Sequence, residues 1–134
     1  MTAAVDITGL NVRFVGERTV HAVNDVDLTV QQGEVLGLLG ESGSGKSVTL
    51  RAMMRLLPTK RAHISGAVSV AGHDVLALDD DQLSAFRGQV ASMIFQEPGL
   101  ALDPVYTIGH QIAETVMRHE GKSRADAMAR ALHM

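Results

Sequence analysis

An eight-residue segment, residues 40–47, constrains the fold of this chain more than any other feature. Its sequence, GESGSGKS, matches the phosphate-binding pattern G-x-x-x-x-G-K-[ST], whose glycines allow a concave turn with inward-pointing backbone N–H groups. An apolar run without alternation, residues 35–39, precedes the loop and predicts a buried strand of a parallel sheet. A helix is predicted from about residue 46 to residue 57, where Pro58 ends it. This strand–loop–helix order predicts a nucleoside triphosphate site in an α/β fold.

The residue types in this segment match the groups that hold a triphosphate. Lys46 supplies a compact cation for the β- and γ-phosphates, and Ser47 supplies a hydroxyl that can ligate Mg²⁺. The N-terminal end of the predicted helix adds the positive end of its dipole. A glycine- and serine-rich linker that contains Lys-Ser by chance is the alternative, and both flanking patterns argue against it. The predicted nucleotide-binding residues are Gly40, Glu41, Ser42, Gly43, Ser44, Gly45, Lys46, Ser47 and Val48.

Composition excludes several other classes of function. The 12 lysines and arginines against 15 aspartates and glutamates give a net charge of −3, and no basic run offers a nucleic-acid footprint. Without cysteine the chain holds no disulfide, iron–sulfur cluster or thiolate zinc site, and its six histidines show no ligand spacing. No apolar stretch reaches the roughly 18 residues of a membrane span, and the N-terminus lacks a secretory pattern. We therefore expect a cytoplasmic protein that meets a membrane only through partners.

Alternation of apolar and polar residues predicts the strands. Residues 5–14 and 20–30 alternate and are joined by a turn, which indicates a half-exposed antiparallel hairpin. Residues 67–71, between Gly66 and Gly72, are a further strand candidate. Residues 89–95 are mostly apolar and predict another strand.

Helical signals dominate the last third of the chain. Ile108, Ile112 and Val116 share one face of a predicted helix. Ser123 with Asp126 three residues later is a capping-box signal, which opens a last helix running to the C-terminus.

Residues 75–80, VLALDD, are an apolar run followed by two acids, which resembles a strand that ends in a metal-binding acid. If Asp79 or Asp80 were that acid, the chain could be a small P-loop kinase or GTPase. The alternative is a turn into a short polar helix over residues 79–86, because acids are favoured at a helix N-terminus. The run is short, and the helix interpretation is preferred.

The surroundings of the loop resemble the ATP-binding subunits of ABC transporters, and the resemblance covers essentially the whole chain. Residues 23–28 and Gly33-Glu34 are similar to the approach to the phosphate loop in that family. Residues 93–98, MIFQEP, resemble its Q-loop. Residues 102–109, LDPVYTIG, with Arg87-Gly88 before them, look like the branch that imports oligopeptides, dipeptides and nickel.

The resemblance implies roles for individual residues. Gln96 would be the Q-loop glutamine, which contacts Mg²⁺ and the attacking water and couples the nucleotide to the membrane subunits. Lys46 and Gln96 are then the expected catalytic residues, and Ser47 and Gln96 the expected Mg²⁺ ligands. Phe14 lies where the family keeps an aromatic that stacks on adenine, and His21 is a weaker candidate for that contact.

Other family segments have no counterpart in this sequence. It contains no Leu-Ser-Gly-Gly-Gln signature, convincing Walker B acid, catalytic glutamate or switch histidine after Gln96. In the family, hydrolysis needs the signature motif of a second subunit. The expected architecture is thus the N-terminal part of an ABC ATP-binding domain, ending inside its helical subdomain, and we expect no ATPase activity from this chain alone. Its expected parts are residues 1–33, an antiparallel β region; residues 34–98, the P-loop core; and residues 99–134, the start of a helical subdomain.

The same resemblance implies partners and a place in the cell. A parent protein of this kind binds ATP and Mg²⁺ and hydrolyses ATP to power import of peptides or similar small solutes. Its partners are transmembrane permease subunits and a second ATP-binding subunit, identical or not, at the cytoplasmic face of the membrane. A module that binds nucleotide without turnover is the remaining alternative.

Overall fold

The structure, a computed structural model, describes residues 3–134. These residues form two compact units, the first ending at Arg87 and the second comprising Gly88–Met134. Among the described residues, the first unit contains every strand and the phosphate-binding segment, and the second contains the helices that follow residue 97. Each unit is described by itself below.

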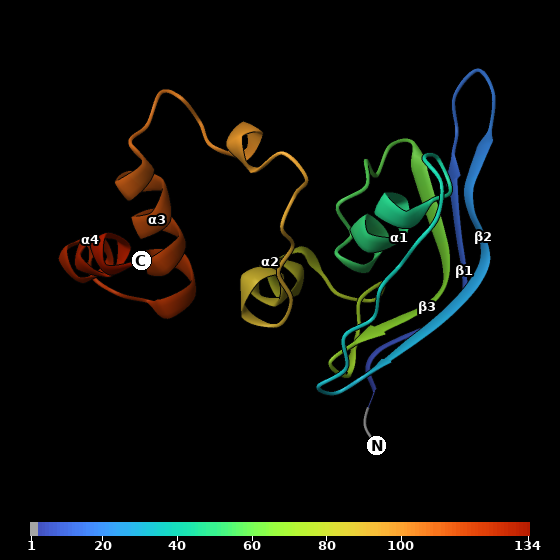
Figure 1. Ribbon diagram of the computed structural model, residues 1–134, viewed down its shortest axis with the longest axis horizontal. Coiled ribbons are helices and arrows are strands. Elements are labelled where there is room, and N and C mark those ends of the chain that lie inside the picture. Colours follow the sequence, from blue (N-terminus) through green and yellow to red (C-terminus); the bar gives the residue numbers. More distant parts are fainter. Residues whose placement is uncertain (1–2) are drawn as a thin grey trace. The chain divides into compact units, whose positions relative to one another are not determined.

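A four-stranded antiparallel sheet builds the first unit (Figure 1). Strands β1 (Ala3–Phe14) and β2 (Val20–Gln31) form the predicted hairpin, β3 (Ala62–Val70) pairs with the other edge of β1, and the two-residue β4 (His73–Asp74) follows. The alternation in residues 5–14 and 20–30 therefore predicted both long strands to within two residues. Strand β3 begins five residues earlier than predicted, and β4 was not predicted. The side chains that fill the face of this sheet are Ile7, Leu10, Val12, Val23, Val68 and Val70.

Helix α1 (Lys46–Met53) lies against one face of the sheet and contacts β1, β2 and β3 (Figure 1). It starts where the sequence predicts but ends at Met53, so the prediction of a helix to residue 57 is wrong. The chain leaves the helix through Arg55, which has a left-handed φ of 48°. Met54 and Leu57 are nevertheless buried, because the turn after the helix folds their side chains into the same core.

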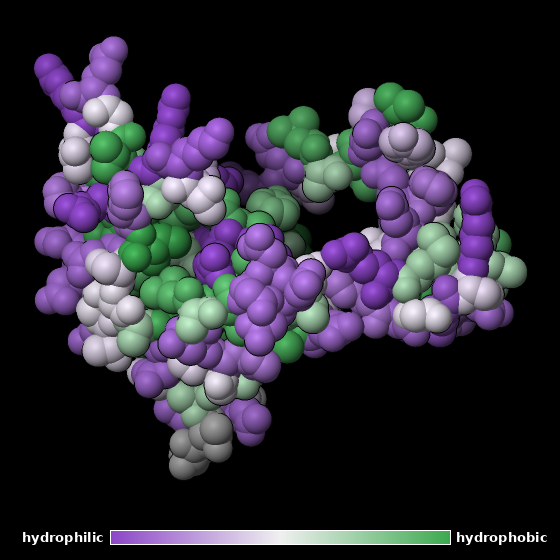
Figure 2. All heavy atoms as spheres, turned by 180° about the vertical axis from the view of Figure 1, so that it is seen from behind, coloured by the Kyte–Doolittle hydropathy of each residue, from purple (hydrophilic) through white to green (hydrophobic). Residues whose placement is uncertain are grey.

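Residues 35–39 do not form the predicted buried strand. They have no regular secondary structure, and Val35 and Leu39 are 96% and 94% exposed. A parallel strand depends on neighbours for its hydrogen bonds, and all strand pairs among the described residues are antiparallel and lie elsewhere. Apolar side chains, green in Figure 2, accordingly reach the surface of the first unit. The expected α/β architecture is present here as its antiparallel part and its helices, without a parallel core.

The predicted strand over residues 89–95 is also absent, for the same reason. Helix α2 (Asp80–Gln89) occupies its first position, and the following residues are irregular apart from one bridge at Ala91. Ile94 is 91% exposed. The polar helix predicted for residues 79–86 is confirmed as α2, which extends three residues further.

The second unit is built on a helical pair. A short 3₁₀ helix, η1 (Pro98–Ala101), precedes α3 (Ile108–Glu120) and α4 (Arg124–His133), which pack on each other through small and apolar side chains. The Ser123 hydroxyl accepts from the Asp126 N–H at 3.2 Å and donates to the Asp126 carboxylate at 2.7 Å, so the predicted cap is confirmed. The buried members of this core are Ala113, Val116, Ala127 and Ala131.

Candidate functional site

The phosphate-binding segment is an exposed turn between residue 40 and the start of α1. Gly43 and Gly45 have left-handed φ values of 80° and 93°, which other residues adopt only at a cost. The Ser44 N–H donates to the Glu41 carbonyl at 3.2 Å, which closes the turn. Sequence and backbone therefore agree: the two glycines stand where the chain must curve back on itself.

Gly45 also allows the loop to pack closely against the hairpin. A Cβ atom at this position would lie 2.5 Å from the carbonyl oxygen of Ala22 in β2, a distance that no side chain can occupy. The helix start is thereby held against the sheet by backbone contact. Gly45 serves as the N-cap of α1, and it has no side chain to bond the first N–H groups of the helix. Those N–H groups can therefore donate to an incoming anion.

Lys46 folds over the loop. Its Nζ donates to the carbonyl oxygens of Gly40 and Glu41, each at 2.7 Å, and to the Ser44 hydroxyl at 3.0 Å. These three bonds match the three donors of an ammonium group and place the positive charge across the mouth of the turn. No acidic residue lies in the first turn of α1. An ammonium group, an uncapped helix N-terminus and the Ser47 hydroxyl on the first turn fit a triphosphate with its Mg²⁺.

Thr49 is a supporting residue that sequence reasoning missed. It is the one polar residue in the buried set of the described chain, and its hydroxyl donates to the Gly45 carbonyl at 3.0 Å. The Thr49 N–H donates to the same oxygen at 2.9 Å. The signal in the sequence was weak: Thr49 stands between the apolar Val48 and Leu50, in a helix that also contains Lys46, Ser47 and Arg51.

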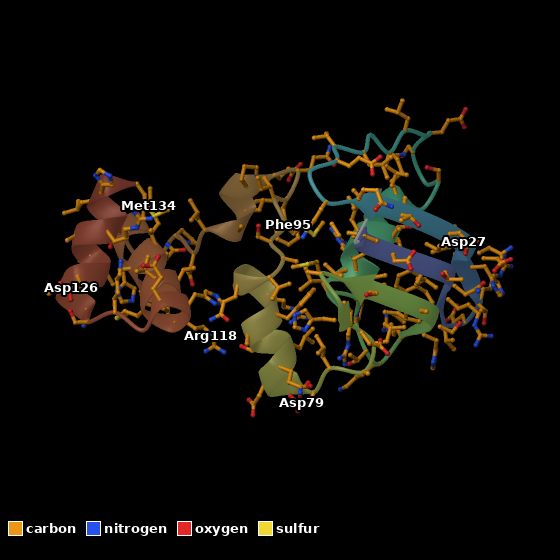
Figure 3. The ribbon with its side chains drawn as sticks, turned by 90° about the horizontal axis from the view of Figure 1, so that it is seen from below. Asp27, Asp79, Phe95, Arg118, Asp126 and Met134 are labelled. Atoms are coloured by element: carbon orange, nitrogen blue, oxygen red, sulfur yellow. The ribbon has the colours of Figure 1, made fainter. Side chains whose placement is uncertain are left out.

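The acidic segment at residues 79–80 caps a helix. The Asp79 carboxylate accepts from the Gln82 N–H at 2.8 Å, and the Gln82 side chain accepts from the Asp79 N–H at 3.0 Å. Asp79 thus lies at the N-terminal end of α2, as labelled in Figure 3, and residues 75–78 form no strand. Among residues 3–134, no group of three or more histidine and acidic side chains could hold a metal ion. The kinase or GTPase alternative built on Asp79 or Asp80 therefore loses its structural basis.

The other predicted site residues have different positions. Phe14 ends β1, paired with Val20, and His21 pairs with Arg13, so both lie near Ala22, the residue that contacts the phosphate loop. Gln96 belongs to the second unit, in the exposed irregular segment after α2. The structure brings residues 40–46 together in one turn and places Gly45 against Ala22 of β2. The roles of Gln96 and Phe14 stay predictions.

Within residues 3–134, no helix is both long and apolar enough to cross a bilayer.

Comparisons with known proteins agree with one another. A family model described as ABC transporter matches residues 23–134. The oligopeptide transport ATP-binding protein OppD of Salmonella typhimurium is 40% identical over 131 residues, covering 97% of this chain and 39% of that protein. The glutathione import ATP-binding protein GsiA of the same organism is 41% identical over 137 residues, covering 97% and 22%.

Solved structures extend the similarity to the fold. The ATP-binding cassette MJ0796, in a dimeric post-hydrolysis state bound to ADP and Pi, superposes with a TM-score of 0.75 at 27% identity. The match covers 96% of this chain and 54% of that one. The chain thus spans about half of a solved cassette and about two fifths of OppD.

Proposed function

The chain belongs to the ABC transporter family of ATP-binding proteins, and we propose that residues 40–48 bind ATP together with Mg²⁺. The observation that carries the proposal is the position of Lys46, whose Nζ lies across the loop mouth above an uncapped helix N-terminus. Both groups present positive charge where the glycine-rich turn leaves room for phosphate oxygens.

Each residue of the loop then has a distinct task. On binding, the Lys46 ammonium group would leave its acceptors in the loop and donate to oxygens of the β- and γ-phosphates. Its hydrogen bonds to these charged oxygens are stronger than those to neutral carbonyl and hydroxyl groups. The Ser47 hydroxyl would hold Mg²⁺, which neutralises phosphate charge when bound. Phe14 would contact the adenine ring from the end of the hairpin. Gln96 would orient a water molecule through its amide, which both donates and accepts.

For the whole protein we propose ATP hydrolysis that drives import of peptides or a similar small solute. The names of OppD and GsiA, which transport oligopeptides and glutathione, support this substrate class. The partners would be transmembrane permease subunits and a second ATP-binding subunit, since the solved relative is dimeric. The protein would then lie at the cytoplasmic face of the membrane.

Substitution of Lys46 tests the nucleotide site. Lys46→Ala removes a charged hydrogen-bond donor worth about 1.5–3 kcal/mol, so ATP affinity should fall tenfold or more. Titration with a fluorescent ATP analogue in the presence of Mg²⁺ measures the change. Lys60→Ala, in an exposed turn of the same unit, is the matched control for loss of one charge and should bind as the unsubstituted chain does. Equal affinities of the Lys46→Ala variant and the control would contradict the assignment.

A further inference from the structure

The helix that carries the phosphate loop ends in an unusual turn. The Arg55 N–H donates to the Ala52 carbonyl at 3.0 Å and the Leu56 N–H to the Arg51 carbonyl at 2.8 Å, which is the pattern of a Schellman motif. The residue in the left-handed position of this motif is usually glycine, but here it is Arg55, with a φ of 48°. A side chain at that position strains the backbone, so the surrounding contacts must hold it there.

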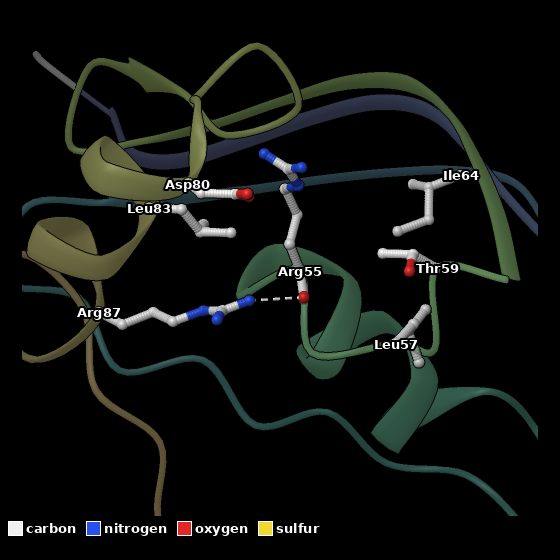
Figure 4. A pocket seen from close by; sticks show the side chains of 7 residues that line it. All are labelled: Arg55, Leu57, Thr59, Ile64, Asp80, Leu83 and Arg87. Carbon is white, nitrogen blue, oxygen red and sulfur yellow. Dashed lines mark hydrogen bonds between the residues drawn. The ribbon is translucent and has the colours of Figure 1, made fainter.

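Two arginines supply those contacts. Arg55 itself donates from its guanidinium group to the carbonyl of Leu78, just before α2. Arg87, near the end of α2, donates from Nε to the Met54 carbonyl at 2.9 Å and from its terminal nitrogen to the Arg55 carbonyl at 2.6 Å. Figure 4 shows the second of these bonds as a dashed line. The arginine pair, Arg55 and Arg87, therefore ties the C-terminal end of α1 to both ends of α2.

Burial and a neighbouring like charge both act on Arg87. Burial lowers the pKa of Arg87, the neighbouring Arg55 lowers it further, and Asp80 opposes both effects. Both arginines and Asp80 line a cavity of about 300 Å³, together with the apolar side chains of Leu57, Ile64 and Leu83 (Figure 4). The carbonyls of Met54 and Arg55, at the negative end of the α1 dipole, accept the hydrogen bonds of Arg87. The Leu78 carbonyl accepts that of Arg55, so both charges are hydrogen-bonded although they are alike.

We propose that Arg55 and Arg87 are positioning residues for the phosphate site. The inference rests on the proposed binding of ATP. Helix α1 has eight residues, too few for stability on its own, and is a rod of about 12 Å. The N-terminal end of α1 presents Lys46 and the free N–H groups to phosphate. The arginine pair holds the C-terminal end of the helix in place. Because α1 is rigid over this length, fixing its C-terminal end also fixes the direction of the N–H groups at its N-terminal end.

Linkage makes this role measurable. If the arginine pair favours the helix position that binds ATP, then ATP must in turn favour the bonds made by the pair. Arg87→Gln shortens the donor and removes its two-pronged geometry, so the dissociation constant of ATP with Mg²⁺ should rise about fivefold or more. Arg51→Gln removes the same charge from an exposed position in the last turn of α1. This control should change the dissociation constant of ATP by less than twofold. In Arg87→Lys, the ammonium group can reach one of the two carbonyls. The dissociation constant of ATP for this variant should therefore lie between those of Arg87→Gln and Arg51→Gln.

Isothermal titration calorimetry together with urea unfolding separates positioning from plain stability. A merely structural Arg87 would raise the apparent dissociation constant only by the reciprocal of the folded fraction, because folding and binding are linked. A rise in Arg87→Gln no larger than its measured folded fraction accounts for would overturn the proposal. Arg55→Gly provides a second variant that relaxes the strained φ while deleting the guanidinium group. It should fold at least as well as Arg87→Gln and still bind ATP more weakly than Arg51→Gln does.

Hydrogen exchange gives an independent reading. ATP should slow exchange of the Arg55 and Leu56 amides in the unsubstituted chain and leave them unchanged in Arg87→Gln. If the unsubstituted chain binds no ATP, the proposed function fails and this inference with it. If it binds ATP, and Arg87→Gln and Arg51→Gln bind equally well, only the positioning role fails.

Discussion

Lys46 illustrates how one side chain can serve both the loop and its ligand. Its three bonds to Gly40, Glu41 and Ser44 give the ammonium group a defined place before any phosphate arrives. A preorganised charge costs less conformational entropy on binding than a freely rotating one. The three bonds therefore keep the ammonium group beside the loop, where phosphate oxygens can replace its loop acceptors.

Gln96 differs from Lys46, because its predicted role depends on parts of the whole protein outside this chain. Gln96→Ala should lower transport-coupled ATP turnover in the whole protein, while ATP affinity stays within a few-fold, because an amide adds less binding energy than a charged group. Transport and nucleotide titration measured on the same preparation distinguish the two effects.

The control for this prediction is Gln32→Ala, which changes an exposed glutamine in the turn after β2. It should transport at the unsubstituted rate. Transport at that rate by the Gln96→Ala protein as well would show that the Q-loop interpretation is wrong.

Helix α2 is an element whose N-terminus explains an acidic cluster without any metal. Asp79 and Gln82 exchange hydrogen bonds across its first turn, and Asp80 and Asp81 lie in that turn at the positive end of the dipole. Asp79→Ala should therefore lower the free energy of unfolding by about 0.5–2 kcal/mol, as loss of an N-cap does. Urea unfolding followed by circular dichroism measures this change.

Asp81→Ala is the control, because it removes a first-turn charge but not the cap. It should destabilise the chain less than Asp79→Ala does. Neither variant should alter ATP affinity, and a loss of Mg²⁺-dependent ATP binding in Asp79→Ala alone would restore the metal-site alternative.

Elements whose partners lie nearby in the sequence could be predicted, and elements with distant partners could not. The hairpin of β1 and β2, helix α2 and the Ser123 cap are set by local alternation and local hydrogen bonds. Residues 35–39 and 89–95 have the composition of buried strands, but composition cannot supply the neighbouring backbone that a strand needs. In the candidate site the loop was predictable from its spacing. Arg55 and Arg87 were not, because Arg55 lay inside the helix predicted for residues 46–57 and the bonds of Arg87 join residues more than thirty positions apart.

For the molecule as a whole, the distribution of functional groups predicts binding without turnover. The sequence contains no signature segment or catalytic glutamate after Gln96, and the proposed site consists of the phosphate loop alone. Phosphate release from Mg²⁺-ATP by the purified chain should equal that of its Lys46→Ala variant. Sustained turnover that Lys46→Ala abolishes would contradict this and would return Asp79 or Asp80 to consideration as an acid of the site.

The open apolar run at residues 35–39 also bears on how long such a chain survives in a cell. Leucine and valine side chains held in water, as Val35 and Leu39 are, attract chaperones and proteases that sort incompletely folded chains. The abundance of the chain should then depend on whether this segment is buried before the chain is degraded. Backbone that pairs with residues 35–39 would bury these side chains and so remove a degradation signal directly beside the nucleotide loop.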